Sequence, residues 1–244
     1  SRKSTRINQY IMILDFYRST VGKKIIMALT GAALLGFVVG HMAGNLKMFG
    51  GVGADGVHKM DHYAEFLRTM GSDLFGRETL LWVARAGLLV CVGLHILMAF
   101  QLSLINSKAR PVGYKSQEYQ SSTLASRGMM FGGIILLSFI VFHILHFTTG
   151  DLHFRGFEYG KVYSNVWNGF QSPSVVAFYI LAMAALSFHT FHGAWSLFQT
   201  LGVDGPKLNP IIRGVALVLA ILLFFGFVSV PIATSMQILS APIG

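Results

Sequence analysis

The chain has 244 residues, of which 53% are hydrophobic and only 12% are charged, and its mean hydropathy is +0.59. Soluble domains carry about 25% charged residues, so this composition excludes an ordinary soluble protein, and the length leaves no room for a large soluble module. The single cysteine, Cys91, excludes an internal disulfide and argues against a zinc or iron–sulfur site held by this chain alone. The formal charge of +9 falls between apolar runs, which favours cationic membrane loops over a nucleic-acid surface.

Five apolar segments follow one another along the chain. They cover approximately residues 25–49, 80–105, 129–149, 175–201 and 211–236. Each is long enough to cross a hydrocarbon core of about 30 Å as a helix rising about 1.5 Å per residue. Each must be helical, because lipid cannot satisfy free backbone groups. The predicted fold class is therefore all-α: one domain over residues 1–244 that forms an integral membrane bundle of five transmembrane helices.

Lysine and arginine predict the orientation of this bundle. The N-terminal arm and the loops between spans two and three and between spans four and five hold twelve of these residues near the membrane, against about six on the opposite side. The positive-inside rule then places the N-terminus in the cytoplasm. The first apolar run is too long for a cleavable signal peptide. In the outer loop 51–79, the spacing of His62, Tyr63, Phe66, Leu67 and Met70 predicts a short amphipathic helix. His58 and His62 are four residues apart and could bind a metal on a helix, but with only Asp61 nearby they are interpreted as solvated loop residues.

Histidines inside the apolar segments are the main functional signal. Six of the nine histidines lie in four of the spans: His41, His95, His143, His146, His189 and His192. Ionisable side chains at membrane depth are costly and usually functional. At about 1.5 Å per residue, His41 and His143 lie at one depth toward the outside, roughly 21–24 Å past the cytoplasmic starts of their spans. His95 and His189 lie roughly 15–18 Å from the cytoplasmic ends of theirs.

Two imidazoles that face each other at one depth are the ligand set of a six-coordinate, electron-transferring b-type haem. Two such layers predict two haems stacked across the membrane. His143 and His146, and likewise His189 and His192, are three residues apart and share a helical face, so spacing alone does not select the ligand in either pair. The glycine row Gly36, Gly40 and Gly44 beside His41 indicates close helix packing, room for a flat macrocycle, or both.

Several segments resemble the dihaem cytochrome b membrane-anchor subunit of succinate:quinone oxidoreductases, the family of succinate dehydrogenases and fumarate reductases. The likeness extends over nearly the whole chain, including the number of helices and the order of the histidines. The similar segments are residues 19–31 (STVGKKIIMALTG), 41–46 (HMAGNL), 78–85 (ETLLWVAR) leading to His95, 142–147 (FHILHF) and 188–202 (FHTFHGAWSLFQTLG). The resemblance implies a bacterial inner-membrane protein with two haems b and a quinone, usually menaquinone, as substrate. It also implies two partner subunits: a flavoprotein that oxidises succinate and an iron–sulfur protein that delivers electrons to the membrane.

The resemblance also implies a ligand set. The distal haem iron would be held by spans one and three, and the proximal one by spans two and four. The position of Gly193 selects His189 over His192, and the order of the span-three pair selects His143 over His146. In some relatives a glutamate before span two belongs to a distal quinol site, and Glu65 is the nearest match. Others have a glutamate two residues before the fourth-span ligand; here Ser187 stands there, which puts proton movement by that route in doubt.

Polar residues at the membrane edges are further candidates. Ser19, Lys23, Ser126 and Arg127 lie near the cytoplasmic face, where they would bind a quinone or a haem propionate, or serve as plain membrane-edge charges. Arg85, deeper in span two, is a candidate for a distal propionate.

Two alternative functions stay open at this stage. One is the dihaem anchor of a fumarate reductase or of another quinone-linked dehydrogenase. The other, a haem-free transporter that uses histidines for protons or metal, would leave the two matched layers unexplained.

Overall fold

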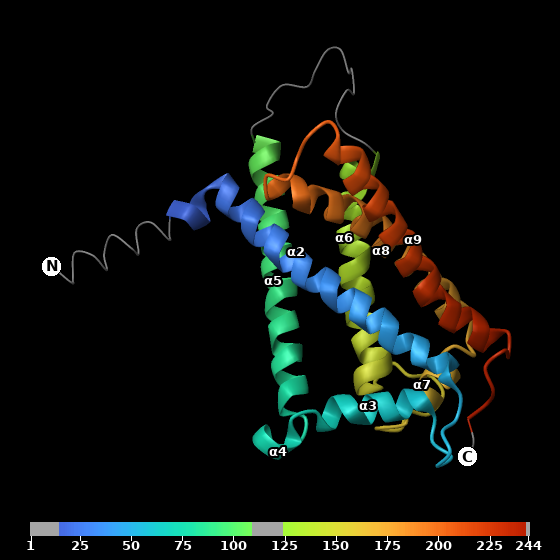
Figure 1. The fold of residues 1–244 in the computed structure, drawn as a ribbon. Coiled ribbons are helices and arrows are strands. Elements are labelled where there is room, and N and C mark those ends of the chain that lie inside the picture. The colour runs from blue at the N-terminus through green and yellow to red at the C-terminus, as the bar shows by residue number, and fades with distance from the viewer. Residues whose placement is uncertain (1–14, 109–123, 243–244) are drawn as a thin grey trace.

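The computed structural model describes residues 15–108 and 124–242, and in these residues every regular element is a helix (Figure 1). Five helices are long and apolar enough to cross a membrane. They are α2 (Thr20–Asn45), which continues into the 3-10 helix η1 (Leu46–Gly50); α5 (Thr79–Lys108); α6 (Leu124–Ile144), which continues into the π-helix η2 (Leu145–Thr149); α8 (Pro173–Thr200); and α9 (Leu208–Ser235). The predicted all-α bundle of five spans is confirmed.

The helices begin earlier than the apolar runs, and for α2 and α8 the residues at the start of the helix explain where the first turn begins. α2 starts at Thr20, where the hydroxyl of Ser19 accepts a hydrogen bond from the Gly22 amide at 2.9 Å. This N-cap satisfies one of the amides that the first turn leaves without an intrahelical partner. α8 begins with Pro173, whose fixed φ and missing amide suit the first helical position.

Three short helices lie across one end of the bundle (Figure 1). They are α3 (Lys59–Thr69), α4 (Ser72–Phe75) and α7 (Val162–Gly169). The amphipathic helix expected within residues 51–79 is confirmed as α3, whereas α7 was not predicted. The amide of Tyr163 at the start of α7 donates to Oδ1 of Asp61 at 2.9 Å, so α3 and α7 are joined directly. This end corresponds to the predicted outer side, because α2, α6 and α9 end there and α5 and α8 begin there.

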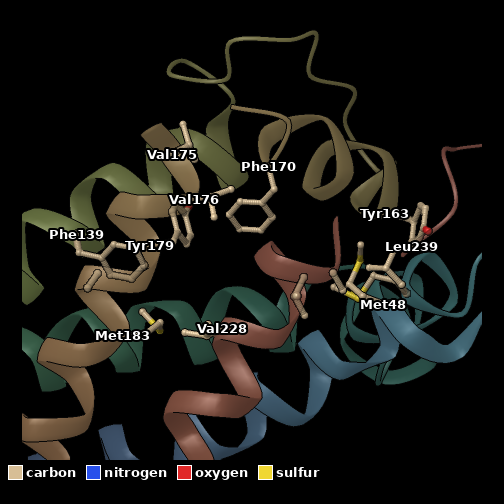
Figure 2. Close-up of a cluster of buried hydrophobic side chains, with 14 residues drawn as sticks. Met48, Phe139, Tyr163, Phe170, Val175, Val176, Tyr179, Met183, Val228 and Leu239 are labelled. Atoms are coloured by element: carbon tan, nitrogen blue, oxygen red, sulfur yellow. The ribbon is translucent and has the colours of Figure 1, made fainter. Parts of the chain in front are cut away.

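Packing among the spans is uneven. α8 packs most extensively against α9 and also contacts α6 and α2, whereas the main neighbour of α5 is α2. The largest buried cluster lies near the end that holds α3 and α7, where Phe139, Phe170 and Tyr179 meet (Figure 2). In mid-membrane, the hydroxyl of Ser187 donates to the carbonyl oxygen of Ala220 at 3.0 Å and links α8 to α9. Ser187 is therefore engaged in helix packing.

Apolar side chains cover much of the outward surface of the spans. On α5, Leu89 and Val90 are 64% and 61% exposed, and Phe225 of α9 is 65% exposed. Exposed apolar surface on this scale is costly in water, because each square ångström of it costs about 25 cal/mol. A lipid environment removes that cost, so the bundle is a multi-pass membrane protein by the character of its surface as well as by helix length.

Candidate functional site

His41 and His143 meet between α2 and α6. Their ring centroids lie 5.8 Å apart, and the ring planes are inclined at 78°. Each imidazole stacks on a phenylalanine one helical turn earlier: His41 on Phe37 at 5.3 Å, and His143 on Phe139 at 5.6 Å. The preceding turn therefore fixes the direction in which each ring leaves its helix.

His95 of α5 and His189 of α8 form the second pair. Their ring centroids lie 6.2 Å apart, with planes inclined at 63°. Nδ1 of His95 is 3.1 Å from the carbonyl oxygen of Met27 on α2. Nδ1 of His189 is buried and has no hydrogen-bond partner among the residues that the structure describes. Gly31, one turn after Met27, lets the His95 ring lie against α2, because a Cβ there would come within 3.2 Å of its Cε1.

The two pairs lie at different positions along α2. The His95 ring lies beside Gly31 on α2, and His41 follows ten residues later on the same helix. At the helical rise, this corresponds to about 15 Å along α2. The pairs are thus stacked, with α2 running past both.

Both pairs fit a metal held between two imidazoles. A metal–imidazole nitrogen bond is about 2 Å long, so two rings on opposite sides of one ion have centroids roughly 6 Å apart. Among the described residues, no three His, Cys, Asp or Glu side chains form a group that could hold a metal ion. A site built on either pair would therefore supply two ligands, as for a haem, whose macrocycle provides the other four. The bond from His95 Nδ1 to a backbone carbonyl is typical of histidines that ligate through Nε2.

His146 is completely enclosed and is not part of either pair. It is 0% exposed, and its ring packs on Phe147 at 4.0 Å and on His153 at 5.1 Å. A Cβ on Gly169 would come within 3.0 Å of its Cε1, so the ring edge lies directly against α7. Protein side chains and α7 surround the His146 ring, so the geometry favours the His143 choice over the His146 alternative.

His192 lies one turn beyond His189 and packs edge-on against Trp195, with ring centroids 6.0 Å apart. The partner of His95 among the ring contacts is His189. Gly193 has nothing within 4 Å of the position of a Cβ, so the face of α8 next to His189 stays open.

Ser19 and Lys23 have local structural partners. The Ser19 hydroxyl donates to the carbonyl oxygen of Phe16 at 2.7 Å in addition to capping α2. Lys23 is buried; its ammonium group donates to the carbonyl oxygens of Tyr17 and Arg18 and lies over the Tyr17 ring. The side chains of Ser126 and Arg127 lie outside the described residues.

Glu65 lies in α3, and both of its carboxylate oxygens accept hydrogen bonds from Arg77, at 2.7 and 2.9 Å. This pair is exposed, and the Arg77 guanidinium holds the pKa of Glu65 below its ordinary value. Arg85 lies over the ring of Trp82 at 4.8 Å, one turn before it on α5.

The glycine row of α2 divides into two kinds of position. A Cβ on Gly36 or Gly40 would meet no atom of the described residues within 4 Å, so neither glycine is required by close packing among them. Gly44 differs, because its Cβ would come within 2.6 Å of the ring of Tyr63 in α3.

His58 was interpreted as a solvated loop residue, and this is wrong. It is buried and stacks on Tyr163 with ring centroids 3.5 Å apart, although it lies at the start of α3. With Met48 and Leu239, His58 lines a cavity of about 310 Å³ near the outer end. Burial raises the pKa of Tyr163.

His62 is exposed as expected, and its Nε2 lies 2.8 Å from Asp55. The contact between His58 and Tyr163 could not be predicted from the sequence, because the two residues come from different outer loops.

Comparisons of the chain with protein-family models, with curated proteins and with solved structures found no match. The fold and the site together define a class: a five-span helical membrane protein with two stacked pairs of facing histidines.

Proposed function

We propose that this chain is the dihaem cytochrome b membrane anchor of a succinate:quinone oxidoreductase in a bacterial inner membrane. The observation that carries the proposal is that four spans bring two histidine pairs together at two depths, with ring separations of 5.8 and 6.2 Å. The resemblance of the span-flanking segments to the anchor subunits of that family supports the particular assignment among dihaem proteins.

In this proposal, each pair holds one haem b. His41 and His143 bind the iron near the outer side, and His95 and His189 bind the iron nearer the cytoplasm. A bound haem supplies a reversible one-electron redox change. The chain orients the ligands: α2 accepts the Nδ1 proton of His95 through the carbonyl oxygen of Met27, and the preceding aromatic turns direct His41 and His143. Holding the other ring nitrogen in this way fixes the tautomer and the ring plane.

The proposed partners follow from the resemblance to the anchor subunits of this family. Succinate oxidation belongs to a flavoprotein subunit and electron delivery to an iron–sulfur subunit, both bound at the cytoplasmic end. The quinone, proposed to be menaquinone, would accept electrons from the chain. Its candidate contacts at that end are Ser19, Lys23, Ser126 and Arg127, and at the outer end Glu65. The structure gives Ser19, Lys23 and Glu65 other hydrogen-bond partners, so a quinone would have to share them.

The runner-up is the anchor of a fumarate reductase or of another quinone-linked dehydrogenase, which would use the same histidine pairs. A haem-free histidine transporter is the less favoured alternative, because it gives no reason for two facing pairs at matched depths.

The test is to purify the chain from its native membrane by a tag on its C-terminus and to measure haem first. Two haems b per chain in the pyridine haemochrome assay, with a low-spin reduced-minus-oxidised spectrum, are expected; a preparation without haem would overturn the proposal. The second measurement asks which partners co-purify. A flavoprotein and an iron–sulfur protein that together reduce quinone with succinate are expected. Two haems without succinate activity would assign the chain to the runner-up class.

A further inference from the structure

The hydroxyl of Tyr179 lies between two histidines that sequence spacing could not distinguish. It is 3.2 Å from Nδ1 of His143 and 3.0 Å from Nδ1 of His146. Tyr179 itself is held in the buried cluster near the outer end, where Phe139 and Phe170 meet its ring edge-on at 5.0 and 4.9 Å (Figure 2). The phenol therefore has one position, and it links the predicted haem ligand His143 to His146, which lies outside the predicted ligand set.

The number of hydrogens available decides which group donates in each of the two hydrogen bonds. A tyrosine hydroxyl has one hydrogen, so it can donate to only one of the two Nδ1 atoms and must accept from the other. If His143 binds iron through Nε2, its remaining proton is on Nδ1, which then donates to Tyr179. Tyr179 must in turn donate to Nδ1 of His146. His146 then has its proton on Nε2, the atom that is buried without a partner in the described part of the chain.

We infer that Tyr179 is a positioning residue that fixes the tautomer and ring plane of His143 and thereby lowers the reduction potential of the haem between His41 and His143. This inference rests on the proposed haem function. A hydrogen-bond acceptor at Nδ1 makes the ligand more basic, and a more basic ligand favours ferric over ferrous iron. Donation to His146 polarises the phenol and strengthens its acceptance from His143, since hydrogen bonds in a chain reinforce one another.

Nδ1 of His95 also has a hydrogen-bond acceptor, but of a different kind. There the acceptor is the main-chain carbonyl oxygen of Met27, which no side-chain substitution removes. The acceptor for His143 is the hydroxyl of the Tyr179 side chain, so a Tyr→Phe substitution removes this hydrogen bond. The two haems therefore provide an internal comparison within each sample.

The experiment is a spectroelectrochemical titration of the purified holoprotein and of Tyr179→Phe, with haem content measured on the same samples. The Phe variant keeps the ring that packs on Phe139 and Phe170 and removes only the hydroxyl. We expect two haems, a more positive potential for the haem between His41 and His143, and an unchanged potential for the other. The low-spin ferric EPR signal of the first haem should also change, because it depends on the angle between the two imidazole planes. Tyr163→Phe, which removes a hydroxyl bonded to the Ser240 carbonyl oxygen, is the matched control and should shift neither potential.

A second pair of variants keeps the test decisive if Tyr179→Phe loses haem. His146→Asn retains an acceptor near the position of Nδ1, and His146→Leu removes it. A positive shift of the same haem in His146→Leu, absent in His146→Asn, supports the inference. Equal potentials in the two His146 variants, or a Tyr179→Phe protein with two haems and both potentials unchanged, overturn it. A wild-type preparation without haem would instead overturn the proposed function, and the inference with it.

Discussion

Nδ1 of His95 lies 3.1 Å from the carbonyl oxygen of Met27, and the same ring rests against Gly31 one turn further along α2. α2 thus both orients the imidazole and leaves it room, while Nε2 stays available for a ligand. The contact joins α5 to α2, its main neighbour in the bundle. A substitution on α2 should therefore be felt at the His95–His189 pair, although α2 supplies no residue to that pair.

Enlarging Gly31 should disturb one haem only. A Cβ at this position would lie 3.2 Å from Cε1 of His95, so Gly31→Ala requires a shift of a few tenths of an ångström and Gly31→Val a larger one. We expect Gly31→Val to lose the haem between His95 and His189 and Gly31→Ala to retain it with an altered potential, while the other haem persists in both. Gly36→Ala is the control, because its Cβ meets nothing within 4 Å. Loss of the haem between His95 and His189 in Gly36→Ala as well would show that α2 is simply intolerant of larger residues.

Single replacements of the intramembrane histidines should divide them into ligands and neighbours. We expect His41→Ala and His143→Ala to lose the same haem, and His95→Ala and His189→Ala to lose the other. His192→Ala and His146→Asn should keep two haems. The measurement is haem stoichiometry together with the reduced-minus-oxidised spectrum. Loss of a haem in His192→Ala, with both haems retained in His189→Ala, would make His192 the ligand from α8. Loss of a haem in His146→Asn, with both haems retained in His143→Ala, would make His146 the ligand in place of His143.

Sequence was sufficient for the spans and for the pairing of their histidines by depth. Apolar length fixes a transmembrane helix, and a constant rise per residue converts position into depth. Sequence spacing cannot decide whether His143 or His146 is the ligand, because the two residues share a helical face. What separates them is tertiary: Gly169 of α7 closes over His146, and α7 itself was not predicted from the sequence.

For the candidates at the membrane edges, the sequence predicted a position but not the hydrogen-bond partners. Ser19, Lys23 and Glu65 were selected as polar groups near a predicted interface, which is a statement about position only. Their partners are the carbonyl oxygens of Phe16, Tyr17 and Arg18 and the guanidinium of Arg77, and no residue-type pattern identifies these contacts in advance. The same holds for His58, whose burial depends on Tyr163 from a different loop.

Removing the Asp61 side chain should loosen the outer end without affecting haem. Its Oδ1 accepts the hydrogen bond from the Tyr163 amide in the first turn of α7, which is the role of a helix cap supplied from α3. Losing a cap costs about 0.5–2 kcal/mol, so Asp61→Ala should lower the thermal midpoint measured in detergent. Asp61→Asn keeps an acceptor and should lower it less. Equal midpoints for Asp61→Ala and the wild type would contradict a capping role.

Glu65 and Arg77 allow a structural role to be separated from a role in quinone binding. If the carboxylate serves only to bind Arg77, then Glu65→Gln and Arg77→Gln should lower the thermal midpoint by similar, small amounts, since exposed ion pairs are weak and screened by salt. The pKa of Glu65 is lowered by Arg77 in the folded state, so the stabilisation is present above the ordinary pKa of a glutamate and is lost as the pH falls through the lowered value.

The difference between wild type and either variant should accordingly vanish at acidic pH and shrink at high ionic strength. Quinone reduction by succinate should be the same in both variants under conditions where both are folded. A loss of quinone reduction in Glu65→Gln that Arg77→Gln does not share would instead show that the carboxylate contacts the quinone, because removing Arg77 frees Glu65 while leaving its charge in place.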